Sequence, residues 1–100
     1  MRLGKQEVDG RALNQLCEQW GVHKLEAFGS VLRDDFGDES DVDLLVTFLP
    51  GRKPKLFGLV EFQEQLQTLL ARRVDLAEPE QLKWVIRDRV LRGARVVYAA

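Results

Sequence analysis

One apolar segment near the middle of the chain restricts the possible folds more than any other feature. The run 42–48 reads Val-Asp-Leu-Leu-Val-Thr-Phe, and a second aspartate, Asp41, stands directly before it. Such runs are typical of strands that are buried on both faces. Because side chains alternate along a strand, Asp41 and Asp43 project from one side while Val42 points into the core. We therefore expect a central strand with two carboxylates at its start.

The two aspartates also indicate a possible binding site for a cation. Two carboxylates on one side of a strand repel each other unless a cation lies between them. Mg²⁺ prefers oxygen ligands in octahedral geometry and usually takes one or two carboxylates, leaving its other positions to water and substrate phosphates. An Asp-x-Asp pair at a strand start fits this demand, although a lone pair of this kind is more often a solvated strand end.

The segment before this strand supplies a possible anion site. An apolar stretch, 22–28, leads into Gly29-Ser30. Glycine lets the backbone approach a phosphate closely, and Ser30 favours the start of a short helix that we expect over 31–33. Free N–H groups at a helix start attract anions, and the guanidinium of Arg33 adds a partner for phosphate oxygens. A Gly-Ser pair alone is usually a turn, but together with the aspartates it indicates a nucleotide site.

The remaining pattern predicts an α+β chain that forms one domain over residues 1–100. Helical spacing is found over 9–20 and again over 59–70, and a short strand follows at 74–77. A last helix is expected after Pro79, and then an edge strand over 95–98. For the last helix we expect a buried face that consists of Leu82, Val85, Ile86 and Val90.

Two features of the C-terminal part have two interpretations each. Asp75 faces opposite to its apolar neighbours in the strand, which suits either an exposed polar residue or a third carboxylate. In the last helix, Trp84, Arg87 and Leu91 share a second face. This face suits a partner surface and a broad core face about equally.

Composition limits the function classes. With a net charge of −1, the chain has no broad basic surface for DNA or RNA, so we expect no direct nucleic-acid binding. The basic residues of the loop 50–55 suit a solvated connection better than a contact with phosphates or with an acidic partner surface. Cys17 is the only cysteine, which excludes an internal disulfide and a thiolate cluster, and its helical position indicates a buried thiol. No membrane span or apolar signal region is present in the sequence, so we expect a cytoplasmic protein.

The combined motif resembles that of a known family. Phe28-Gly29-Ser30, Arg33 and the segment 40–46 resemble the signature of the minimal nucleotidyltransferases, which belong to the DNA polymerase beta-like superfamily. The resemblance implies a small mixed β-sheet with helices packed on one side. It implies Mg²⁺ as cofactor and ATP as the nucleotide donor. The residues that it implies are Asp41, Asp43 and Asp75 as catalytic metal ligands, and Gly29, Ser30, Arg33 and Ser40 as nucleotide-binding residues.

The resemblance also implies a function. Minimal nucleotidyltransferases are commonly antitoxins paired with a HEPN-domain ribonuclease, and such enzymes attach AMP to a side-chain hydroxyl of that partner, with which they can form a hetero-oligomer. A chain of this length leaves no room for a separate acceptor-binding domain, so we expect another molecule to bring the hydroxyl.

The alternative is an antitoxin that occludes the toxin by surface contact with weak or no catalysis. An acidic loop favours this alternative. Asp34 stands where the family commonly has glycine, and Asp35, Asp38 and Glu39 follow. Their charges would oppose binding of a triphosphate but suit contact with a basic ribonuclease. A plain scaffold with accidental carboxylates would show no Mg²⁺-dependent ATP binding.

Overall fold

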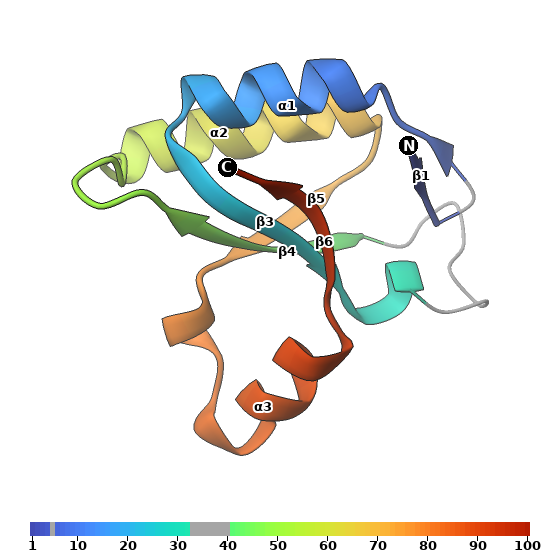
Figure 1. Ribbon diagram of the computed structural model, residues 1–100, viewed down its shortest axis with the longest axis vertical. Helices are drawn as coiled ribbons and strands as arrows, with labels where there is room; N and C mark the ends of the chain where they lie inside the picture. The colour runs from blue at the N-terminus through green and yellow to red at the C-terminus, as the bar shows by residue number, and fades with distance from the viewer. Residues whose placement is uncertain (5, 33–40) are drawn as a thin grey trace.

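The computed structural model describes residues 1–4, 6–32 and 41–100 (Figure 1). Arg33, Ser40 and the acidic loop between them lie outside these residues. In chain order the elements are β1 (Arg2–Leu3), β2 (Gln6–Glu7), α1 (Gly10–Gln19), β3 (Val22–Phe28), the short 3₁₀ helix η1 (Gly29–Leu32), β4 (Val42–Phe48), α2 (Leu56–Leu70), β5 (Val74–Ala77), the 3₁₀ helix η2 (Pro79–Gln81), α3 (Trp84–Gly93) and β6 (Arg95–Ala99).

The main sheet has four strands in the order β5-β4-β3-β6. β3 runs antiparallel to both β4 and β6, whereas β4 and β5 are parallel. Parallel neighbours require a crossover connection, and α2 provides it between β4 and β5. The predicted α+β fold with a mixed sheet is therefore confirmed, and the C-terminal strand lies at an edge of the sheet as expected.

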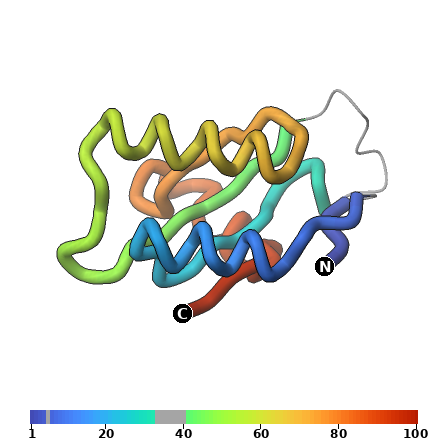
Figure 2. Tube along the Cα trace, turned by 90° about the horizontal axis from the view of Figure 1, so that it is seen from above, coloured from blue at the N-terminus to red at the C-terminus, as the bar shows by residue number. Residues whose placement is uncertain are grey.

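The core lies between one face of the sheet and the helices α1 and α2 (Figures 1 and 2). α1 begins after Asp9, whose carboxylate accepts hydrogen bonds from two backbone N–H groups at 3.1 Å each. Phe62 of α2 is fully buried, and its ring centroid lies 5.7 Å from that of Trp20 and 6.2 Å from that of Phe48. Cys17 is buried as expected, and this burial raises the pKa of its thiol to about 12.

The last helix differs from the prediction. α3 lies on the other side of the sheet from α1 and α2, and none of its residues is buried (Figures 1 and 2). The predicted buried face is wrong, because the side chains of Val85 and Ile86 are 63% and 42% exposed. Helical spacing shows which residues share a face, but it does not show whether another element covers that face. Among the described residues, no helix has the length and apolar character needed to cross a membrane.

Candidate active site

The parallel strands β4 and β5 bring the candidate carboxylates to one face of the sheet. Asp43 is the register partner of Asp75, and Val42 is the register partner of Val74. Register partners project from the same face, and Asp41 shares the face of Asp43 because it precedes it by two residues. Since Val42 and Val74 are buried in the core under the helices, the aspartates lie on the opposite face.

Gly29 lies against this group of carboxylates. It directly follows β3, whose last residue, Phe28, is the register partner of Asp43. Its φ of +74° favours glycine, and a Cβ at this position would lie 2.5 Å from Oδ2 of Asp43. Gly29 is therefore required both by its backbone conformation and by the proximity of the carboxylate.

The helical turn after Gly29 begins earlier than predicted. The expected helix over 31–33 is observed as the 3₁₀ helix η1, in which Ser30 is the second residue. Val31 is 3% exposed and anchors η1 in the core, and η1 packs against β4. The anchored turn therefore holds the backbone of Gly29 and Ser30 beside the strand that carries Asp43.

An arginine that the sequence patterns did not indicate also lies in the site. Nε of Arg73 lies 3.3 Å from Oδ1 of Asp41, and the backbone carbonyl of Arg73 accepts a hydrogen bond of 2.9 Å from the N–H of Val42. The available signal was strand alternation, because Arg73 precedes Asp75 by two residues and so projects from the same face.

The rest of this face forms a buried floor next to the aspartates. Leu45 follows Asp43 by two residues and is fully buried, as the sequence indicated for this strand. Its register partner, Glu26, is only 6% exposed and forms an ion pair of 3.7 Å with Lys24. The carboxylates therefore lie at the border between a low-dielectric floor and solvent, where charge interactions are stronger than in open water.

The arrangement suits a cation that is shared with a substrate. Within residues 1–4, 6–32 and 41–100, no group of three or more His, Cys, Asp or Glu side chains is arranged to hold a metal ion. Mg²⁺ does not require such a group, because it usually binds one or two carboxylates and completes its shell with water and phosphate oxygens. Asp43 and Asp75, as register partners, form a pair of this kind, and Asp41 next to them forms an ion pair with Arg73.

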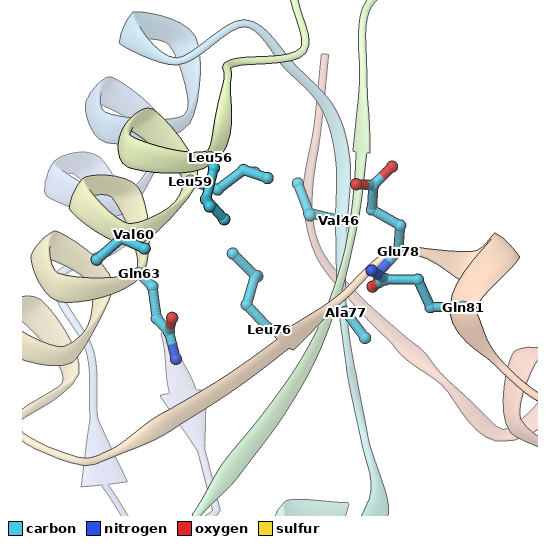
Figure 3. Close-up of a pocket in the computed structure, with 9 residues that line it drawn as sticks. All are labelled: Val46, Leu56, Leu59, Val60, Gln63, Leu76, Ala77, Glu78 and Gln81. Atoms are coloured by element: carbon cyan, nitrogen blue, oxygen red, sulfur yellow. The ribbon is translucent and has the colours of Figure 1, made fainter.

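A separate cavity of about 180 Å³ lies toward the other ends of β4 and β5 (Figure 3). Its walls come from α2, the two strands and η2, and they consist of Val46, Leu56, Leu59, Val60, Gln63, Leu76, Ala77, Glu78 and Gln81. Lys53 forms an ion pair of 2.8 Å with Glu78, and this hydrogen bond raises the pKa of Lys53. The basic loop that contains Lys53 is therefore held to the body of the protein at this cavity.

Comparisons with known proteins agree with the fold and identify the family. The chain is 42% identical over 84 residues to the protein adenylyltransferase MntA of Thermococcus cleftensis, a match that covers 84% of this chain and 81% of that protein. A solved structure described as that of a minimal nucleotidyltransferase superposes with a TM-score of 0.70 at 36% identity and covers 85% of each chain. The MNT antitoxin in complex with a tri-AMPylated HEPN toxin of Shewanella oneidensis has the same fold, with a TM-score of 0.63 at 16% identity, covering 91% of this chain and 70% of that one.

A family model extends the similarity over nearly the whole chain. The nucleotidyltransferase domain model matches residues 10–97, which include both strands that carry the aspartates and the turn at Gly29. The recognition from the sequence motif is confirmed, and the protein is an enzyme of this class. The chain belongs to the nucleotidyltransferase domain family.

Proposed function

We propose that this protein is a protein adenylyltransferase that transfers AMP from ATP to a side-chain hydroxyl of a HEPN ribonuclease toxin and thereby acts as its antitoxin. The observation that carries the proposal is the pair of register partners Asp43 and Asp75 beside the glycine turn. The relative from Thermococcus cleftensis is named a protein adenylyltransferase, and the HEPN toxin in the Shewanella oneidensis complex is tri-AMPylated. Both names support the same reaction and the same class of acceptor.

The carboxylates bind and orient the reacting groups. Asp41, Asp43 and Asp75 would hold Mg²⁺ on the triphosphate. When bound, Mg²⁺ neutralises charge on the phosphate oxygens and on the leaving pyrophosphate. Asp75 is exposed at the sheet edge and also accepts or orients the proton of the acceptor hydroxyl. The hydroxyl oxygen forms a bond to the α-phosphorus while the bond from that phosphorus to the β-phosphate bridging oxygen breaks.

The turn after β3 forms the phosphate-binding side of the site. Backbone N–H groups of Gly29 and Ser30 point toward the β- and γ-phosphates in this proposal, since a glycine permits close approach of an anion. Arg33 and Ser40 are assigned to nucleotide binding from the family motif alone, because they lie outside the described residues. Positioning and charge neutralisation then supply most of the rate enhancement, as in other phosphoryl transfers.

AMP on a ribonuclease side chain explains how transfer neutralises a toxin. The added nucleotide brings bulk and a negative phosphate, and both oppose binding of an RNA phosphate at the same place. The acceptor hydroxyl comes from the partner itself, so complex formation also positions the substrate.

One observation favours the alternative in which the protein mainly occludes the toxin. Trp84 and Val85 of α3 are 83% and 63% exposed, and exposed apolar side chains that lie together mark protein-binding surfaces. The two functions are compatible, because an enzyme that modifies a protein must also bind it.

Substitution of one carboxylate separates the two functions. We expect the wild-type chain, incubated with ATP, Mg²⁺ and its partner toxin, to add the mass of AMP to the toxin, and we expect Asp43→Asn to abolish this addition. Mass spectrometry of the intact toxin measures the outcome. Glu61→Gln is the control, since it also removes one carboxylate charge but lies on the exposed surface of α2, away from both α3 and the candidate carboxylates. Neutralisation of the toxin without any mass change in the wild type would show that occlusion is the function.

A further inference from the structure

Arg73 occupies the position where a cation would interact with Asp41. The parallel register that pairs Val42 with Val74 places Arg73 beside Asp41 one residue earlier. The N–H of Val42 donates to the carbonyl of Arg73 at 2.9 Å, which fixes the two backbones at this point. The side chains then meet at 3.3 Å between Nε and Oδ1. The sheet register therefore brings Arg73 and Asp41 side by side, which allows the ion pair.

The ion pair of Arg73 and Asp41 is exposed to solvent, so each side chain can readily exchange its partner for another charged group. The side chains of Arg73 and Asp41 are 80% and 46% exposed, so water competes for both charges. Exposed ion pairs contribute little, typically about 0.2–1 kcal/mol in mutant cycles. A divalent cation or a triphosphate can therefore replace either partner at low cost.

The face of the sheet around the ion pair of Arg73 and Asp41 carries charges of both signs. Binding of a metal-bound nucleotide would change the contacts between these charges. Asp43 and Asp75 project from it as register partners, and the ion pair of Arg73 with Asp41 lies directly before the two strands. A carboxylate bound to Arg73 is less available to a cation, whereas a guanidinium released from Asp41 matches the geometry of phosphate oxygens.

We propose that Arg73 is an exchangeable counter-ion, which holds Asp41 until a metal-bound nucleotide arrives and then binds the triphosphate. This role rests on the proposed nucleotidyl transfer and adds a residue to it. Arg73 opposes binding of a divalent cation alone and favours binding of the cation together with the nucleotide. The site thus selects the metal–nucleotide complex over the free metal ion.

Arg73→Gln tests the proposal because it changes two affinities in opposite directions. Without nucleotide, we expect the variant to bind Mn²⁺ roughly two- to fivefold more tightly than the wild type, because competition for Asp41 is lost. With Mg²⁺ present, we expect it to bind a non-hydrolysable ATP analogue about tenfold more weakly, because a charge-assisted contact is lost. Isothermal titration calorimetry of the full chain measures both values, and Arg73→Lys should give intermediate values for each.

Two comparisons make the outcome decisive. Arg11→Gln changes the net charge equally on the exposed surface of α1, on the other side of the sheet, and should shift neither affinity. If Arg73→Gln weakens both affinities together or changes neither, Arg73 has only a structural role or none, and the proposal is overturned. Absence of Mg²⁺-dependent nucleotide binding in the wild type would instead contradict the proposed function itself.

Discussion

At the scale of single residues, Gly29 shows how closely backbone conformation and chemistry are linked in this site. We expect Gly29→Ala to lower the free energy of unfolding by about 1 kcal/mol, because alanine is strained at positive φ. It should also reduce binding of Mg²⁺ with a non-hydrolysable ATP analogue at least about tenfold, since the new Cβ displaces the carboxylate of Asp43, which lies 2.5 Å away. Urea unfolding and calorimetry measure the two effects.

Gly51→Ala is the matched control for this prediction. Gly51 has the same φ of +74°, but a Cβ there meets no atom within 4 Å. Both variants should therefore lose similar stability, and only Gly29→Ala should lose nucleotide affinity. Equal affinities in the two variants would show that contact with Asp43 is not what requires glycine at position 29.

At the scale of elements, the end of α2 contains a strained residue. Ala71 caps this helix in the left-handed conformation, with φ 54°, a position usually taken by glycine. We expect Ala71→Gly to raise the free energy of unfolding by about 1 kcal/mol, because relief of strain exceeds the added flexibility of the unfolded chain. The same substitution at Ala94, which caps α3 with φ −71°, should instead lower it by about 0.5–1 kcal/mol. Urea unfolding that gives the same sign for both variants would contradict this account.

The elements also show which parts of the fold can be read from the sequence. β4 was predictable because its apolar run and its alternating aspartates both depend on local chain geometry. Arg73 was missed because its role depends on the pairing of β4 with β5, which is a long-range property. The exposure of α3 was missed for a related reason, because the spacing of its apolar residues does not show whether another element packs against them. Sequence patterns thus predicted the longer helices and the strands of the main sheet, but not the short strands β1 and β2, and tertiary pairing decided which polar residues meet.

At the scale of the whole molecule, the sheet separates a face that gives stability from the face that carries the candidate carboxylates. The helices α1 and α2 cover one face with the core, and the candidate carboxylates project from the other. The thermal stability of the free protein and its response to ligand should therefore depend on different residues. A ligand present at about a hundredfold excess over its Kd adds about 2.7 kcal/mol, which for a domain of this size raises Tm by roughly 10–20 °C.

Two substitutions test this separation by differential scanning fluorimetry with and without Mg²⁺ and a non-hydrolysable ATP analogue. Leu66→Ala removes a fully buried side chain of α2 and should lower the stability of the free protein by about 2–5 kcal/mol while the ligand still raises Tm. Asp75→Asn changes an exposed residue and should leave the free protein within about 0.5 kcal/mol of wild type, but most of the ligand-induced rise should disappear. If Leu66→Ala also abolished the ligand response at temperatures where the variant is folded, the core and the site would be coupled through the sheet. We expect Asp75→Asn to change the free energy of unfolding little because Asp75 is exposed on an edge strand and does not pack in the core.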